Sequence, residues 1–451
     1  MARIRKPEPF QSLMAKIPPQ ELLRAMSGYG LTNAQGEYLP WDKFQWRVSK
    51  GEDKTLAWVA TKMARMSASR EIPELCAETS DDFFRFTVPE SLQAKLHYID
   101  KLVGGNQNIS DHPFFNQGEK NSYLVRSLLM EEAITSSQLE GASTTRKVAK
   151  EMLQTERQPK DKSEQMIANN YRLMKTAVER REEDLSLELI LEFHQIATHR
   201  AIDNNAVPGE FRASNDIDVR DIYDEVAHIP PSADSIEQRM QSLCEFANYS
   251  HSQLESDNFI HPLIKAITLH FMVAYIHPFG DGNGRTARAL FYWFMLKSGY
   301  WLFEYVSISK LIQEKRGDYD KAFVYTETDD NDLTYFIYHQ VGVVVQAVNA
   351  LQDYIQRKQK ELHEFMFWLD NSTVAKRLKR GQLDILRDAV KSPGRVFTVK
   401  SVANDLGVGG NTARHYLNDL ADRDLLIPAK SAVGKALRYI APANLRDALK
   451  S

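Results

Sequence analysis

The stretch His277–Arg288, HPFGDGNGRTAR, decides the fold at the centre of the chain. It holds a histidine, a carboxylate, an asparagine, three glycines and two arginines within twelve residues. Glycines allow backbone N–H groups to turn inward and approach an anion closely. After Gly284, apolar residues recur at helical spacing from Ala287 to Phe294, so the stretch leads into the N-terminus of a helix. A glycine-rich turn in front of a helix N-terminus is typical of a phosphate-binding site.

The polar side chains of this stretch fit the same chemistry. Arg285 and Arg288 are three residues apart, so they share a helical face and can bind two phosphate groups. Asp281 can hold Mg2+ through one carboxylate oxygen, as carboxylates do where the ion also binds phosphates. His277 stands at the entrance of the turn, and the near-neutral pKa usual for histidine suits a base that takes a hydroxyl proton.

The stretch resembles, position for position, the signature of Fic-domain proteins, HxFx(D/E)GNGRxxR. Most of that family transfers AMP from ATP to a hydroxyl side chain of a target protein. The resemblance implies that His277 is the catalytic general base, that Asp281 binds Mg2+, and that Arg285 and Arg288 bind the outer phosphates. The nucleotide-binding residues that it implies are Phe279, Gly280, Asp281, Gly282, Asn283, Gly284, Arg285 and Arg288.

A second motif precedes the core in the segment Leu128–Ser143. Ser136, Glu140 and Gly141 resemble the inhibitory motif of Fic proteins, (S/T)xxxE(G/N). Ser136 and Glu140 lie on one helix face, and Gly141 can end that helix in a left-handed conformation. The Glu140 carboxylate could pair through both oxygens with Arg288, which a γ-phosphate would also need. The alternative is that Glu140 is an ordinary charge at a helix end.

The apolar pattern predicts a mainly α fold. The resemblance implies that it is a Fic helical core with a short β-hairpin flap, and the C-terminal segment resembles a small winged-helix domain. Helices are expected over 122–139, 144–156, 163–181, 186–200, 235–252 and 261–276. The expected division is an N-terminal helical region (1–105), the Fic core (106–330), a helical linker (331–374) and a winged helix-turn-helix (375–451). The core contains the inhibitory motif (136–141), the flap (about 213–229) and the catalytic loop (277–288).

The flap prediction rests on the alternation of Ile217, Val219 and Ile222, which suits a short hairpin. In Fic proteins the corresponding flap pairs with the backbone of the target; the alternative is a surface loop.

In the N-terminal region, Trp41, Phe44 and Trp46 alternate like a strand or an aromatic loop anchor, and Thr55–Met66 is expected to be a helix. The segment Asn331–Leu369 is expected to be helical with one break.

The C-terminal segment is basic. Ala375–Ser451 has fifteen Lys and Arg against seven Asp and Glu, a balance of +8, whereas the rest of the chain has 42 against 53, or −11. Its predicted order of helices and strands resembles a winged helix-turn-helix, with Asn411 capping the recognition helix and Asn418 on the same groove-facing side. This predicts duplex DNA as a partner, and the alternative is protein binding or dimerisation. The predicted DNA contacts are Lys400, Thr412, Arg414, His415, Lys435 and Arg438.

Composition is ordinary for a soluble globular protein, with 43% hydrophobic and 26% charged residues among 451. Cys76 and Cys244 are too few for a disulfide framework. The chain shows neither a signal-peptide core nor an apolar stretch of bilayer length, so we expect a cytoplasmic protein without a membrane partner.

Together these features predict an autoinhibited protein adenylyltransferase that uses ATP and Mg2+ and modifies a Ser, Thr or Tyr hydroxyl of a protein target and of itself. Two alternatives stay open. One is a Fic enzyme that removes AMP or transfers another phosphate-linked group. The other is a DNA-binding regulator in which the Fic core is a nucleotide sensor. Tyr319 and Tyr325 are candidates for stacking on adenine, and a homodimer is one alternative for the assembly.

Overall fold

Two apolar helices, α11 (Pro262–Ile276) and α12 (Asn283–Lys297), form the centre of this computed structural model. Thirteen of the fifteen residues of each helix are buried, as expected for helices that are apolar on all faces. Pro262 occupies the first turn of α11, and the His261 ring accepts the N–H of Leu263 (3.1 Å). The structure describes residues 4–77, 82–103, 122–155, 157–202, 206–220, 226–250, 258–391, 395–430, 437–442, Leu445 and Leu449.

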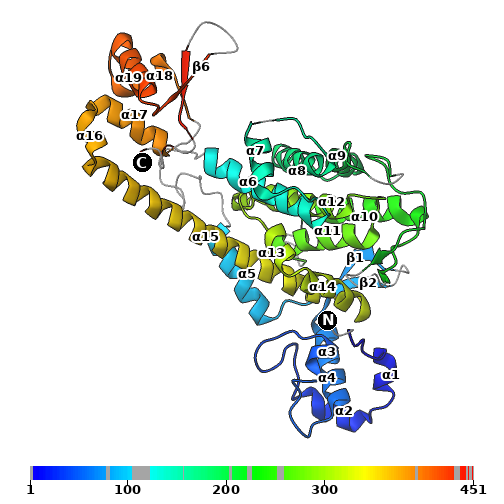
Figure 1. Cartoon of the computed structure of the whole chain (residues 1–451). Helices are drawn as coiled ribbons and strands as arrows, with labels where there is room; N and C mark the ends of the chain where they lie inside the picture. The colour runs from blue at the N-terminus through cyan, green and yellow to red at the C-terminus, as the bar shows by residue number, and fades with distance from the viewer. Residues whose placement is uncertain are drawn as a thin grey trace. The chain divides into compact units, whose positions relative to one another are not determined.

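The chain divides into two compact units, and the larger comprises residues 1–106 and 128–348. In this unit α8, α9 and α10 pack around the pair α11–α12 (Figure 1). Its helices besides that pair are α1 (Phe10–Met14), α2 (Pro19–Met26), α3 (Trp41–Phe44), α4 (Lys54–Ala68), α5 (Glu90–Val103), α7 (Arg146–Thr155), α8 (Lys162–Glu179), α9 (Leu187–Thr198), α10 (Ile236–Asn248), α13 (Ser309–Glu314) and α14 (Arg316–Thr328), with the 3-10 turns η1 (Ala233–Ser235) and η2 (Trp301–Glu304).

Two helices cross the boundary between the units. They are α6 (Ser122–Leu139) and α15 (Thr334–Asn371). The predicted break in the second of these is wrong, because α15 is continuous over 38 residues. Its apolar spacing continues without a proline or a turn sequence that would end a helix.

Two short hairpins complete the larger unit. Strands β1 (Arg70–Cys76) and β2 (Phe83–Phe86) are antiparallel, with Arg70 opposite Phe86. Strands β3 (Val219–Arg220) and β4 (Val226–His228) form the hairpin predicted for the flap, with Val219 opposite His228. The predicted flap residue Ile222 lies outside the described residues.

The N-terminal aromatic residues pack differently from the expectation. Trp41–Phe44 is a helical turn, α3, so the prediction of a strand or loop is wrong. Trp41 and Phe44 both pack on Trp58 of α4, with ring centroids 5.5 and 5.0 Å apart, whereas Trp46 is 66% exposed. A helical turn places residues three apart on one side, which explains why Trp41 and Phe44 reach the same partner.

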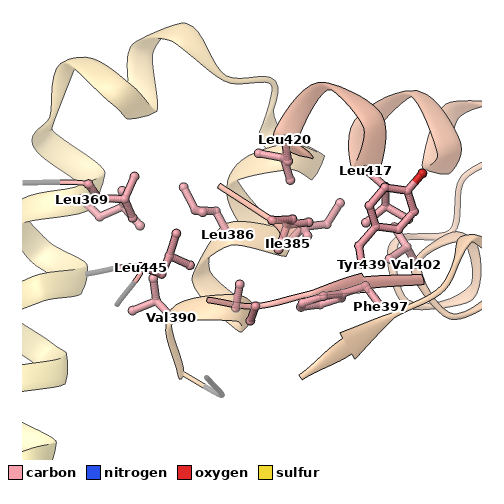
Figure 2. Close-up of a cluster of buried hydrophobic side chains, with 14 of the residues drawn as sticks. Leu369, Ile385, Leu386, Val390, Phe397, Val402, Leu417, Leu420, Tyr439 and Leu445 are labelled. Carbon is pink, nitrogen blue, oxygen red and sulfur yellow. The ribbon is translucent and has the colours of Figure 1, made fainter. Parts of the chain in front are cut away.

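The smaller unit comprises residues 107–127 and 349–451. Its elements after α15 are α16 (Thr373–Arg377), α17 (Arg380–Lys391), β5 (Val396–Phe397), α18 (Val399–Leu406), α19 (Gly410–Asp422), β6 (Ile427–Lys430) and β7 (Leu437–Ile440). The three strands form an antiparallel sheet in the order β5-β7-β6. Figure 2 shows its core, where Leu386 and Ile385 of α17 lie near Leu417 and Leu420 of α19 and Phe397 of β5.

The start of α19 differs from the expectation. Its N-cap is Gly409, without a side-chain cap, so the prediction that Asn411 caps this helix is wrong. The two consecutive glycines let the helix begin before Asn411.

The thiols of Cys76 and Cys244 are both free. Among the described residues, no helix combines the length and the apolar character needed to cross a bilayer.

Candidate active site

The turn between α11 and α12 is held by its own asparagine. Nδ2 of Asn283 donates to the carbonyl oxygen of Phe279 (2.8 Å), and the N–H of Phe279 donates to Oδ1 of Asn283 (3.0 Å). His277 ends α11 in the left-handed backbone region (φ 48°). That conformation is strained for a histidine, and strained residues gather at functional sites. Asn283 therefore fixes the path of the turn that carries His277.

His194 of α9 ties this turn to a second segment. Its Nδ1 accepts the N–H of Gly209 (3.0 Å), and its Nε2 lies 2.9 Å from the carbonyl oxygen of Asp281. Because a backbone N–H only donates, Nδ1 carries no proton and Nε2 donates to Asp281. Burial lowers the pKa of His194 to about 4, which maintains this neutral form. The ring also stacks on the buried Phe279, with centroids 3.7 Å apart.

Two glycines of the turn leave room for close neighbours. A Cβ atom on Gly282, which has φ 83°, would lie 2.6 Å from Cγ2 of Thr198. A Cβ atom on Gly284 would lie 2.2 Å from Oε1 of Glu140. Both distances are too short for any Cβ, so glycine is required at each position for this packing. The second contact also places a carboxylate at the first turn of α12, where the helix dipole favours negative charge.

Arg285 is almost fully buried, at 1% exposure. Its Nη1 donates to the carbonyl oxygen of Ala197 (2.6 Å), and its Nη2 lies 3.4 Å from Oδ1 of Asp281. The same Asp281 oxygen accepts the N–H of Gly282 (2.5 Å). Burial lowers the pKa of Arg285, with Asp281 and Glu140 acting in the opposite direction. Arg285 thus braces Asp281 and α9 in this state of the protein.

Arg288 joins α12 to the end of α6. Its Nε donates to Oγ of Ser136 (2.8 Å), and its Nη2 donates to the carbonyl oxygen of Ser136 (3.1 Å) and to Oε1 of Glu140 (2.9 Å). The structure therefore contains the Glu140–Arg288 ion pair expected from the sequence, but through one carboxylate oxygen rather than two. Ser136 accounts for the difference, because it accepts from the other side of the guanidinium group. Gly141 has φ 94°, as expected for a residue that ends a helix.

Glu140 is charged in this environment. Burial alone would raise its pKa, but the charge and hydrogen bond of Arg288, with the charges of Arg285 and Arg316, hold the pKa below its usual value. Arg316 also donates to the carbonyl oxygen of Leu139 (3.2 Å), which fixes the last turn of α6. A carboxylate on Arg288 at this place would compete with an anionic ligand for the same guanidinium group.

His277 lies beside the flap. Arg212 donates from Nε to the carbonyl oxygen of His277 (2.8 Å) and from its backbone N–H to that of Pro278 (2.9 Å). Burial lowers the pKa of His277 to about 4; the Ala274 carbonyl opposes this shift, and His228 and Arg212 reinforce it. An imidazole with a low pKa is neutral at physiological pH, so it is ready to accept a proton.

The two tyrosines considered for adenine stacking are both 8% exposed. Tyr319 lies on Phe323 and Phe336, and its hydroxyl is 3.0 Å from Nε2 of His270. Tyr325 donates to Asp42 (3.0 Å) within a cluster that includes Tyr335. Their rings therefore pack inside the protein, and stacking on adenine by either one would require a rearrangement.

The structure brings together every residue predicted for the nucleotide site and the restraint. Of the residues predicted to contact DNA, Lys400, Thr412, Arg414, His415 and Arg438 are exposed on the smaller unit, and Lys435 lies outside the described residues. Asn418, which was expected to face the same groove, is also exposed, and its Oδ1 accepts the hydroxyl of Tyr439.

Sequence reasoning missed His194, Arg212 and His228. Each is separated from the turn by tens of residues, and a local motif carries no information on contacts at that range. One signal was available: PGEFR at 208–212 combines a glycine with an arginine between two predicted helices.

Comparison with known proteins identifies the central domain. Residues 184–295 match the sequence model of the family described as Fic/DOC. A protein adenylyltransferase Fic from Drosophila virilis is 29% identical over 206 residues, which are 40% of this chain and 38% of that protein. One from Nematostella vectensis is 30% identical over 118 residues, which are 26% of this chain and 24% of that protein. The matched segments thus span well under half of these relatives.

Solved structures of similar proteins include a Fic family protein from Desulfovibrio desulfuricans G20. It is 18% identical, with a TM-score of 0.49, and the match covers 79% of this chain and 97% of that one. For Fic-1 from C. elegans the values are 19% identity, a TM-score of 0.45, and coverage of 58% and 71%. The match of residues 184–295, which include the whole turn from His277 to Arg288, shows that this chain contains a domain of the Fic/DOC family.

Proposed function

We propose that this protein transfers AMP from ATP to a hydroxyl side chain of a protein target, and that Glu140 restrains the reaction. The observation that carries the proposal is the arrangement around one turn. His277, with a lowered pKa, begins the turn that leads into α12, and the Glu140 carboxylate that pairs with Arg288 lies against Gly284 in the first turn of that helix. The curated relatives named protein adenylyltransferase Fic support this choice of reaction.

In the proposed mechanism His277 accepts the proton of the target hydroxyl group. The oxygen then forms a bond to the α-phosphorus of ATP, the bond from that phosphorus to the bridging oxygen of the β-phosphate breaks in line, and pyrophosphate leaves. The backbone N–H groups at the start of α12 stabilise the negative charge that develops on the phosphates. Arg288, once released by Glu140, binds the γ-phosphate.

The residues present fit Mg2+ of the kind that is held together with a nucleotide. No group of three or more His, Cys, Asp or Glu side chains within the described part of the chain could form a dedicated metal site. Asp281 is 32% exposed and uses Oδ1 in the contacts with Gly282 and Arg285. One carboxylate with substrate phosphates is the usual Mg2+ arrangement. When bound, the ion would neutralise charge on the phosphates.

The test is AMP incorporation by the full chain carrying Glu140→Gly. The protein is incubated with Mg2+ and with ATP labelled on either the α- or the γ-phosphate, and Glu140→Gly with His277→Ala is the control. We expect retention of α-label and an intact-mass increase of one AMP, both lost in the control. Retention of γ-label would instead indicate phosphoryl transfer. Absence of any transfer would favour the nucleotide sensor.

A second candidate function concerns the smaller unit. We propose that α19 contacts duplex DNA, because Thr412, Arg414 and His415 are exposed while Ala413, Leu417 and Leu420 face the core. The +8 balance of Ala375–Ser451 supports an anionic partner. The full chain should bind duplex DNA with an affinity that falls steeply as salt rises, and less so in Arg414→Ala. Binding that is absent, or insensitive to salt and to Arg414→Ala, would favour a protein partner.

A further inference from the structure

Arg212 joins both ends of the flap to the turn that carries His277. Its Nη1 donates to the carbonyl oxygen of Ser214 (2.8 Å), near the start of the flap, and its Nη2 to that of Pro231 (2.5 Å), just beyond its end. Its Nε donates to the carbonyl oxygen of His277 (2.8 Å). One planar guanidinium group therefore sets the spacing of three backbone positions, which a lysine could not reproduce because its three donors share one nitrogen on a flexible chain.

His228, on the second flap strand β4, is held at both ring nitrogens. Nδ1 lies 2.7 Å from Oε2 of Glu327 on α14, and Nε2 lies 2.7 Å from the carbonyl oxygen of Tyr275 on α11. Both partners accept hydrogen bonds. The two contacts hold the ring between α14 and α11 and so fix the position of β4 against both helices.

These contacts converge on His277. Tyr275 is two residues before His277, so His228 fixes the last turn of α11 while Arg212 fixes the residues that follow it. The His228 ring also lies 4.9 Å from the Tyr275 ring. His228 and Arg212 each lower the pKa of His277. The same two side chains thus hold the flap and act electrostatically on the imidazole ring.

We propose that Arg212 and His228 form a two-point anchor that sets the position of the flap against the His277 ring. The flap anchor, meaning Arg212 and His228, consists of positioning residues. The inference deepens the proposed function and rests on it for its effect on AMP transfer. A target segment laid along β3–β4 would then meet His277 at a fixed distance, so the anchor would select which hydroxyl group is modified.

Two variants separate the parts of the anchor. Arg212→Lys keeps the charge but has all its donors on one nitrogen, so it cannot hold the three carbonyl groups at the same spacing. His228→Gln likewise has its N–H donors on one nitrogen, whereas the ring contacts its two partners through nitrogens on opposite sides. Arg181→Lys is the matched control, because Arg181 is 45% exposed and pairs with Glu182 (3.2 Å) away from the flap. All three changes are made in the full chain that also carries Glu140→Gly.

The first two readouts do not depend on activity. Hydrogen–deuterium exchange of peptides covering 213–220 and 226–231 should become faster in Arg212→Lys and His228→Gln but not in Arg181→Lys. NMR of chains labelled at the histidine Cε1, with the His277 signal assigned by His277→Ala, should show a raised pKa of His277 in His228→Gln. The same pKa should stay unchanged in Arg212→Lys and Arg181→Lys, which keep their charge.

The third readout is self-modification with AMP at saturating ATP. Both anchor variants should lose about 10- to 100-fold in rate, since a misplacement of roughly 1 Å can cost on the order of 10^2-fold. The ATP dissociation constant, measured by calorimetry, should match that of Arg181→Lys, because the anchor contacts Tyr275, His277 and Pro278 and none of the residues at the N-terminus of α12.

The outcomes distinguish the two proposals. Unchanged exchange in both anchor variants, or an unchanged pKa of His277 in His228→Gln, would overturn the anchor. Faster exchange with undiminished AMP transfer would overturn its positioning role. If the Glu140→Gly parent transfers no AMP, the proposed function fails, and the exchange and NMR results still decide whether the anchor sets the flap and the His277 ring.

Discussion

At the scale of single residues, both the backbone and the side chain of His277 suit a proton acceptor at the end of α11. The left-handed conformation (φ 48°) turns the chain from α11 into the turn before α12, and burial lowers the pKa of the ring so that it is neutral. Strain of this kind persists only where neighbouring contacts hold it, and here Arg212 and the Val273 carbonyl do so. The proposed base is thereby held in place by contacts within the protein.

The lowered pKa of His277 makes a prediction for pH dependence. A base acts only when unprotonated, so a pKa of about 4 means that kcat/KM for AMP transfer should be constant from pH 8 to pH 5.5. The measurement uses Glu140→Gly, in which the charge that raises the His277 pKa is absent. A halving of kcat/KM near pH 6.5, the usual histidine value, would show that the ring is more exposed to water than the structure indicates.

His194 makes a second prediction at this scale. Its Nε2–H holds the Asp281 carbonyl, so His194→Leu should weaken Mg2+-ATP binding by about 10- to 100-fold, as supporting residues of metal ligands typically do. His194→Gln keeps an N–H donor of similar reach and should recover part of the affinity. Calorimetric titration in the Glu140→Gly background measures both. Equal losses for Leu and Gln would mean that the stacking on Phe279, and not the hydrogen bond, supports the turn.

The residues within the turn between α11 and α12 could be predicted from the sequence. The residues of other elements that contact this turn could not. His277, Asp281 and Arg288 belong to one short pattern with an evident phosphate chemistry. His194 is 87 residues from Asp281 and reaches it only because α9 packs on α12. Its neutral tautomer follows from the Gly209 N–H, a contact that no local spacing encodes. The single-oxygen pairing of Glu140 likewise depends on how Ser136 shares the guanidinium group.

At the scale of secondary-structure elements, the last turn of α6 presents Ser136 and Glu140 to Arg288 as a unit. Glu140→Gly removes the competing carboxylate, so ATP affinity and self-modification should both rise. A coupling of about 1–3 kcal/mol, typical between linked sites, corresponds to roughly 5- to 150-fold. Calorimetry with ATP and intact mass after subsaturating ATP measure the two effects.

The control for this prediction is the double variant Glu140→Gly with Arg288→Ala. It should lose most of the gain, because the freed guanidinium group is what the first change supplies. Equal ATP affinity in wild type and Glu140→Gly would show that the pair at 2.9 Å only fastens the end of the helix.

Elements with strong apolar periodicity were predictable. The expectations for 122–139 and 261–276 agree with α6 and α11 to within one residue at each end. The short elements could not be predicted from the sequence. The strand β1, REIPELC, mixes charges with a proline, and its pairing with β2 supplies the order that its own sequence lacks. The aromatic residues were read as alternating because Phe44 and Trp46 are two apart, but α3 ends at Phe44 and Trp46 lies outside it.

At the scale of the whole molecule, the chain contains two units, each with its own buried core. In the smaller unit the core joins α17, α18, α19 and the sheet, and Leu386 at its centre is fully buried (Figure 2). The sequence indicated this division through charge, since the basic segment begins near the end of α15. The position of the boundary could not be predicted, because the apolar pattern of α15 runs across it without interruption.

Because each unit has its own core, a substitution that destabilises one core should leave the stability of the other unit unchanged. Leu386→Ala should leave a cavity and destabilise the smaller unit by about 2–5 kcal/mol. Leu437→Ala is the matched control, because Leu437 is 42% exposed and its truncation removes little buried surface. Hydrogen exchange of amides in α17 and α19 should accelerate in Leu386→Ala while amides in α11 and α12 stay protected. Equal acceleration in both sets would mean that α15 couples the two cores into one cooperative unit, and a change in the smaller unit would then reach the nucleotide site.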